Sequence, residues 1–184
     1  ASAGARPSSI RESGTDTAVS PWVSAKDTRT RAPPWGTVNG SALTTVLGQP
    51  NAVSGTVNRN AGQTTDNGMS SPRGLWVTGT NLIIADSGNN RVLIYNDYTT
   101  LAATDDVPEK VIGQVGFFVG PVNGGITPSA ATLSNPVGIA VTGSGSSAGL
   151  IVADSGNSRL LVFNNIANLP ATGGVADKVI GQAD

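Results

Sequence analysis

Two short segments carry the residues whose types and spacing could do chemistry: in each, an aspartate stands five positions before an arginine. Asp86–Arg91 reads DSGNNR, and Asp154–Arg159 reads DSGNSR. A carboxylate in this setting can bind a metal ion, act as a general acid or base, or accept hydrogen bonds within a turn. A catalytic residue is normally needed once, whereas this motif occurs twice. We therefore interpret both aspartates as structural turn residues.

The spacing of the motif suits a tight turn between two strands. Asp86 can accept hydrogen bonds from the next backbone amides, Gly88 supplies a positive φ at little cost, and Asn89 tolerates the left-handed region. The guanidinium of Arg91 can then reach back to Asp86. The second copy offers the same structural turn residues, which are Asp154, Gly156, Asn157 and Arg159.

Histidine and cysteine are absent from all 184 residues. A zinc finger, a disulfide framework and a Ser-His-Asp triad are therefore excluded for this sequence. We expect no catalytic residue, no cofactor and no metal, with calcium as the alternative that carboxylates alone would permit. The candidates for calcium are the two turn aspartates and an acidic cluster at Asp105, Asp106 and Glu109, which we interpret as a solvated loop.

The turn motif belongs to a longer internal repeat. The tetrapeptide VLGQ at Val46–Gln49 recurs as VIGQ at Val111–Gln114 and at Val179–Gln182, with spacings of 65 and 68 residues. Between these markers, Ser71–Gly79 and Asn135–Gly143 share a Pro-x-Gly-aliphatic-x-Val pattern. Self-similarity at a fixed period indicates stacked supersecondary units.

Each unit is predicted to contain four short antiparallel strands. Aliphatic runs such as Leu82–Ile84 and Val92–Ile94 place apolar side chains on both faces of the sheet, so each sheet needs a neighbour on both sides. The expected strands are Gly74–Thr78, Asn81–Ala85, Arg91–Tyr95 and Lys110–Gly113, then Gly138–Thr142, Leu150–Ala153, Arg159–Phe163 and Lys178–Gly181.

These blocks in this order resemble the NHL repeat, in the form found in bacterial extracellular proteins. The resemblance covers about residues 68–184 and implies an all-β protein, a β-propeller built from four-stranded blades. Blade one would span about 68–114 and blade two about 132–182, within a propeller segment at 43–184. Leu43–Leu47 would be the outer strand of a preceding blade. The links between strands are longer than the compact family pattern.

Positions where the two units differ are candidates for interaction. Arg73 stands where the other unit has Val137, and Trp76 stands where it has Ala140. The resemblance places Arg73 at the mouth of the central channel, as a possible ligand contact, with a solvated arginine as the alternative. Trp76 is either a ligand platform or bulk packed between blades.

Residues 1–42 do not follow the repeat, and we expect an irregular or extended N-terminal arm there. They contain Trp22 and Trp35, two of the three tryptophans in the chain. Two free tryptophans in a flexible arm would be unusual, so we expect at least one to pack against the blades or another subunit. Asn39 begins a glycosylation sequon, which we interpret as a chance match.

Charge and composition bear on partners and compartment. Residues 41–184 carry 6 positive and 9 negative charges, which argues against nucleic-acid binding. Apolar runs of four or five residues are too short to span a membrane. Only three Lys and two Glu, on a background rich in Thr, Asn, Ser and Gly, favour a secreted or cell-surface protein.

The sequence therefore predicts a non-catalytic extracellular scaffold or protein-binding surface. Two blades do not close a propeller, so we expect further blades or further copies of the chain as partners, in a ring or a filament. The alternative is part of a propeller enzyme, a metal-dependent lyase or lactonase, whose catalytic residues lie outside this chain.

Overall fold

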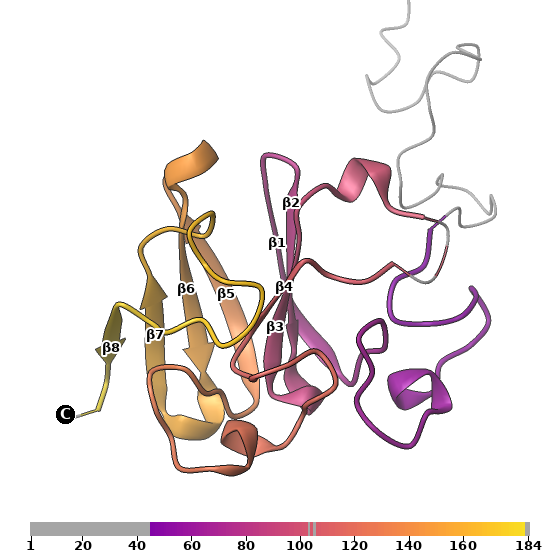
Figure 1. Cartoon of the computed structure of the whole chain (residues 1–184), viewed down its shortest axis with the longest axis horizontal. Helices are drawn as coiled ribbons and strands as arrows, with labels where there is room; N and C mark the ends of the chain where they lie inside the picture. The colour runs from indigo at the N-terminus through magenta and orange to yellow at the C-terminus, as the bar shows by residue number, and fades with distance from the viewer. Residues whose placement is uncertain (1–44, 103, 105, 183–184) are drawn as a thin grey trace, which may run out of the picture. The chain divides into compact units, whose positions relative to one another are not determined.

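The computed structural model of the chain describes residues 45–102, 104 and 106–182. Two four-stranded antiparallel sheets make up the fold, and in both the strands follow one another in chain order (Figure 1). The first sheet consists of β1 (Pro72–Thr78), β2 (Asn81–Asp86), β3 (Arg91–Tyr95) and β4 (Lys110–Ile112). The second sheet consists of β5 (Pro136–Thr142), β6 (Gly149–Asp154), β7 (Arg159–Phe163) and β8 (Lys178–Ile180).

All eight strands expected from the repeat are present, with ends that differ by at most two residues. The two sheets have the same register, and in both the pairing shifts by one residue, at Arg73 in β1 and at Val137 in β5. The inserted residues of the second unit form a short 3₁₀ helix, Gly145–Ser147, between β5 and β6. The fold is thus all-β, as predicted.

The pleat gives each sheet two distinct faces. Trp76, Ile83, Ile94 and Lys110 lie opposite one another in register and share the side that we call the forward face of the first sheet. In the second sheet, the forward face carries the corresponding residues Ala140, Ile151, Val162 and Lys178. We call the opposite side of each sheet its rear face.

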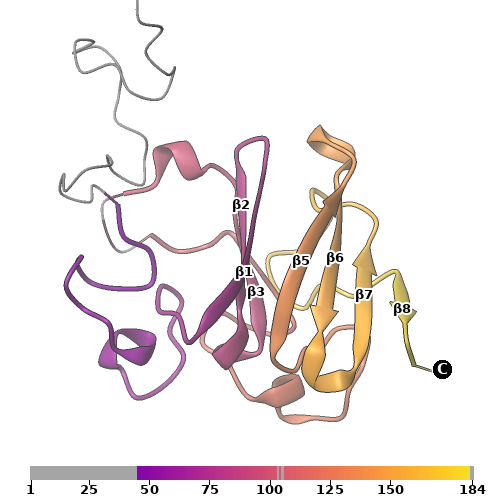
Figure 2. The same ribbon diagram turned by 180° about the vertical axis from the view of Figure 1, so that it is seen from behind.

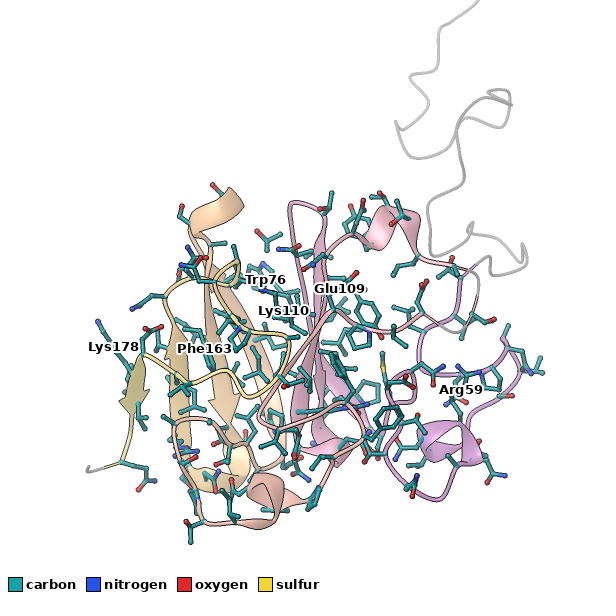
Figure 3. All side chains as sticks on the ribbon, in the orientation of Figure 1. Arg59, Trp76, Glu109, Lys110, Phe163 and Lys178 are labelled. Atoms are coloured by element: carbon teal, nitrogen blue, oxygen red, sulfur yellow. The ribbon has the colours of Figure 1, made fainter. Side chains whose placement is uncertain are left out.

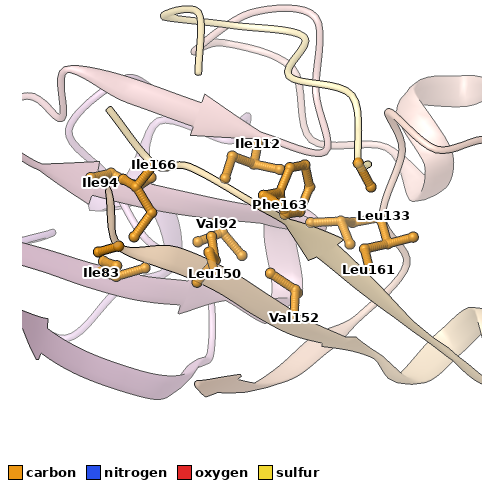
Figure 4. Packing of buried hydrophobic residues seen from close by; sticks show 12 residues of the cluster. Ile83, Val92, Ile94, Ile112, Leu133, Leu150, Val152, Leu161, Phe163 and Ile166 are labelled. Atoms are coloured by element: carbon orange, nitrogen blue, oxygen red, sulfur yellow. The ribbon is translucent and has the colours of Figure 1, made fainter. Parts of the chain in front are cut away.

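The main core lies between the forward face of the first sheet and the rear face of the second (Figure 4). Its central members on the first sheet are Ile83, Val92, Ile94 and Ile112, all at most 1% exposed. The second sheet contributes Leu150, Val152, Leu161 and Phe163. Figure 2 shows β5 beside β1, with β8 at the far edge of the second sheet.

A smaller core covers the rear face of the first sheet, where Leu82, Ile84 and Leu93 pack with Met69 and Leu47. Leu47 was expected in a strand at Leu43–Leu47. That prediction is wrong for residues 45–47, which form no strand, and Gly48 makes only an isolated parallel bridge with Gly68. A fourth strand needs a third strand to pair with, and residues 45–102 provide none beside it.

Among the described residues, no helix is long and apolar enough to cross a membrane. The helical segments are 3₁₀ turns of three or four residues.

Tyr95 gives a test of core packing. Its hydroxyl is buried and meets no hydrogen-bond partner among the described residues, and burial raises the pKa of Tyr95. The second sheet has Phe163 at the matching position of β7. Tyr95→Phe should therefore leave stability unchanged or raise it by about 1 kcal/mol, since it removes an unpaired buried polar group.

Urea unfolding of wild type and Tyr95→Phe measures this difference. A loss of more than about 1 kcal/mol would mean that the hydroxyl has a partner, and Phe163→Tyr serves as the reverse substitution, expected to destabilise.

Candidate functional site

The repeated motif forms the turn between the second and third strands of each sheet. Asp86 ends β2, Ser87–Asn89 make one 3₁₀ turn, and Arg91 begins β3. Asn90 is the left-handed residue, at φ 53°, and Ser158 takes the same place in the second sheet at φ 52°. The prediction that Gly88 supplies the positive φ and Asn89 the left-handed conformation is wrong, because Asn90 alone has a positive φ in this turn, two positions after Gly88 and one after Asn89.

Gly88 is needed for a different reason, which is close approach of two backbones. Its N–H donates to the carbonyl of Ser70 at 2.8 Å, and a Cβ on Gly88 would stand 2.8 Å from that oxygen. Gly156 repeats the contact with Ser134, where a Cβ would stand 2.7 Å from the carbonyl oxygen. A side chain at either glycine would push the turn off the preceding link.

The carboxylate of Asp86 is fully buried and accepts three hydrogen bonds. Oδ1 accepts from the backbone N–H of Ser70 at 2.7 Å. Oδ2 accepts from Asn89 Nδ2 and Arg91 Nε, both at 2.8 Å. The aspartate thus bonds to a backbone amide 16 residues earlier, and the expected bonds to the amides that follow it are absent.

Arg91 reaches back to Asp86, as the spacing suggests, and its side chain is also fully buried. Nη2 donates to the carbonyls of Thr65 at 2.9 Å and Gly68 at 2.8 Å, and Nη1 donates to the carbonyl of Phe117. The guanidinium therefore connects the turn to the link that precedes β1 and to the link that follows β4.

The second unit repeats this network with the same atoms. Asp154 accepts from Ser134 N at 2.7 Å, and from Asn157 Nδ2 and Arg159 Nε at 2.8 Å. Arg159 donates to the carbonyls of Ser129 and Thr132. Its side chain is 6% exposed, against 0% for Arg91, because no third carbonyl covers it among the described residues.

Sequence reasoning missed a pair of asparagines that completes each network. Asn58 and Asn89 exchange two side-chain amide hydrogen bonds, at 3.0 and 2.7 Å. Asn123 and Asn157 make the same exchange, at 3.2 and 2.7 Å. The available signal was that Asn58 and Asn123 each stand nine residues after the glutamine of a marker tetrapeptide.

The glutamine of the marker also contacts the turn of its own sheet. Gln114 Nε2 donates to the carbonyl of Asn90 at 2.9 Å, and Gln182 Nε2 donates to the carbonyls of Asn157 and Ser158. The second and third repeat markers are therefore hydrogen-bonded to the turn of their sheet, whereas Gln49 of the first marker donates to the carbonyl of Thr56.

This arrangement favours a structural role over a chemical one. Each aspartate already accepts hydrogen bonds from three residues, and the arginine paired with it would repel a cation placed beside the carboxylate. Within residues 45–102, 104 and 106–182, no group of three or more acidic side chains is placed to hold a metal ion. Asp105 of the acidic cluster lies outside the described residues, and Glu109 Oε2 accepts from the backbone N–H of Asn96.

The other candidate residues lie apart from this network. Arg73 is exposed at the bulge of β1. Trp76, 41% exposed, lies on the forward face of the first sheet, in register with Ile83 of the main core (Figure 3). The structure therefore places Trp76 on the side that meets the second sheet. Trp22, Trp35 and Asn39 lie outside the described residues.

No protein-family model matches the sequence, and no curated protein shows significant similarity to it.

The buried ion pairs predict a graded loss of stability. Asp86→Ala should cost about 3–5 kcal/mol, because it leaves the guanidinium of Arg91 buried without its carboxylate. Asp154→Ala should cost less, about 1–3 kcal/mol, because Arg159 is closer to solvent. Chemical denaturation of the two variants measures both values.

Asp177→Ala is the matched control. Asp177 is exposed and accepts one backbone hydrogen bond, from Asn164 at 2.7 Å, so its loss should cost under about 1 kcal/mol. Equal costs for all three variants would contradict a special role for the buried pairs.

Proposed function

We propose that this chain is a non-catalytic scaffold segment of the NHL-repeat β-propeller type, in which successive sheets act as blades that stack face to face. The observation that carries the proposal is the interface between the two sheets. In it, residues of the repeat in the first unit contact the sheet and the links of the second unit. Its apolar part is the main core described above. Its polar part lies at the two ends of the sheets.

At one end, Lys110 on the forward face of the first sheet holds the link between β7 and β8. Its Nζ donates to the carbonyls of Ile166 and Ala167 at 3.0 Å and of Leu169 at 2.7 Å. Partial burial lowers the pKa of Lys110 below its ordinary value. Three converging carbonyls nevertheless favour the ammonium form there.

The backbone of β4 and of Gln114, which follows it, adds a second set of contacts to the same link. Val111 N donates to the carbonyl of Ala171 at 2.8 Å, and Gly173 N donates to the carbonyl of Gln114 at 3.1 Å. The outer edge of the first sheet is thereby covered by chain from the second unit, which protects an otherwise open strand edge.

At the other end, the turn of the first sheet contacts the start of the second. Ser87 Oγ donates to the carbonyl of Pro136. Asn90 accepts from the N–H of Asn135 at 2.8 Å and donates to the carbonyl of Gly120 at 2.9 Å. Because the turn is already rigid through Asp86, these bonds set the distance and angle between the sheets.

Composition supports the remaining parts of the proposal. The net charge of −3 over residues 41–184 disfavours binding to nucleic acid, and the scarcity of Lys and Glu favours an extracellular location. Both buried aspartates already accept three hydrogen bonds within their own turn and link, which supports a role as a scaffold or binding surface instead of catalysis. The partners that suit such a scaffold are proteins, foremost further sheets of the same kind.

Lysine substitution tests the stacking role. Lys110→Met should lower stability by about 1–2 kcal/mol and speed amide exchange in the link 164–177, because three carbonyls lose their donor. Lys178→Met is the matched control, since Lys178 is exposed at the equivalent position of β8 (Figure 3). Hydrogen exchange with mass spectrometry reports both; equal effects of the two substitutions would contradict the stacking role.

A titration with single-stranded RNA at low salt tests the rival class of function. No change in fluorescence anisotropy is expected, because the described surface offers few cations. Binding that weakens steeply with added salt would replace the scaffold proposal with an RNA-binding one.

A further inference from the structure

An apolar hollow of about 440 Å³ lies on the rear face of the first sheet, and its lining includes Thr45, Leu75 and Leu101. Leu75 is 64% exposed, so the hollow is open to solvent. We propose that it binds an aliphatic primary amine, with the alkyl chain on the apolar lining and the ammonium on the backbone carbonyls of Thr99 and Leu101. Its volume falls within the range of about 300–1,000 Å³ that is usual for small-molecule sites.

Residues 45–48 lie on the rear face of the first sheet as residues 110–113 lie on that of the second. Leu47 packs against the smaller core, and Ile112 belongs to the main core. The glycine that follows each of them has a positive φ, of 81° and 90° respectively. The two segments therefore occupy equivalent places, although residues 45–48 form no strand.

The link at 96–101 has the same local backbone structure as the link at 164–169. In each, a side-chain oxygen, of Asp97 or Asn165, accepts from the N–H two residues later, at 2.9 and 2.8 Å. The residue after it donates its own N–H to the carbonyl that directly precedes β2 or β6, again at 2.9 and 2.8 Å. Carbonyls at equivalent positions of the two links therefore have equivalent local arrangements.

Two of the three carbonyls that hold the ammonium of Lys110 have counterparts in the first unit, at Thr99 and Leu101. The counterpart of Lys110 itself is Thr45, whose side chain is three bonds shorter. Thr45 and Leu101 both line the hollow, so the hollow extends along the path that a lysine side chain would take. An alkylammonium ligand has the shape and the donor group that Thr45 lacks.

Charge also favours a cation at this site. The link 96–109 contains four acidic residues and no basic one, whereas the link 164–177 contains one acidic residue and no basic one. Asp97, two residues before the first of these carbonyls, stands where the second link has Asn165. Asp106 Oδ2 is buried and has no hydrogen-bond partner among the described residues. An ammonium gains from this surplus of negative charge, whereas a carboxylate is repelled by it.

Calorimetric titration of the full chain with three ligands of equal length tests the proposal. Octylammonium should bind saturably at one site, 1-octanol at least about tenfold more weakly because it lacks the charged donor, and octanoate not at all. Each methylene added to the amine should tighten binding by about two- to fourfold until the hollow is filled.

Thr45→Lys is the decisive variant, because it gives the hollow the ammonium that Lys110 supplies in the other unit. Octylammonium should then bind at least about tenfold more weakly, since the carbonyls already have a donor. Thr45→Val is the matched control, and its affinity should stay within about twofold of wild type. Circular dichroism checks that both variants are folded.

Asp97→Asn separates the charge from the apolar contact while it keeps the side-chain oxygen that Asn165 uses. The affinity for octylammonium should fall by about two- to fivefold at low salt, and that for octanol should not change. Asp177→Asn makes the same change of charge at the exposed aspartate of the second link and should change neither affinity.

The proposal is overturned if octylammonium shows no saturable binding, if octanol binds as tightly as octylammonium, or if Thr45→Lys binds octylammonium as wild type does. A dimer in light scattering that forms with rising protein concentration and excludes octylammonium would make a second copy the occupant of the hollow, and would overturn it as well.

Discussion

The structure depends on burying one carboxylate–guanidinium pair in each unit. Charges removed from water are tolerated only when every donor and acceptor around them is satisfied. For Asp86 and Arg91 that requirement involves the amide of Ser70, the amide of Asn89 and three backbone carbonyls. The pair thereby imposes a conformation on links that have little regular structure of their own. In a chain with 12% charged residues, these few charges are concentrated where they organise loops.

The same requirement explains how two sheets acquire a defined relative position. A flat aliphatic interface alone permits sliding, because burial is roughly proportional to area and has no direction. Here each end of the interface also has directional bonds, from Lys110 at one end and from Ser87 and Asn90 at the other. The turn that presents Ser87 and Asn90 is rigid because Asp86 anchors it. Local burial of charge and long-range stacking are therefore one connected system.

How much of this structure the sequence predicts depends on how far apart in the chain the interacting residues lie. Strands, their order and their register depend on local patterns that occur twice, so all eight were predictable. The pairing of Arg91 with Asp86 spans five residues and was also predictable. The bond from Ser70 and the exchange between Asn58 and Asn89 join a turn to a link 16 to 31 residues away. The conformation of those links depends on the fold itself, so the equal spacing of Asn58 and Asn123 from a marker glutamine could mark them as repeated residues but could not name their partners.

Positions at which the two units carry different residues show most clearly how their surroundings differ. A residue that serves its own sheet should be the same in both, and the aspartate, arginine, glycine and asparagine of the network are. Two residues on the side of the next unit differ: Trp76 becomes Ala140, and Asn90 becomes Ser158. The second sheet therefore projects less side-chain volume at Ala140 than the first does at Trp76, and it has a hydroxyl at Ser158 in place of the amide of Asn90. A sheet that packs there as closely as the second packs on the first must project more side-chain volume opposite Ala140, because an unfilled space at that position would forfeit part of the packing energy.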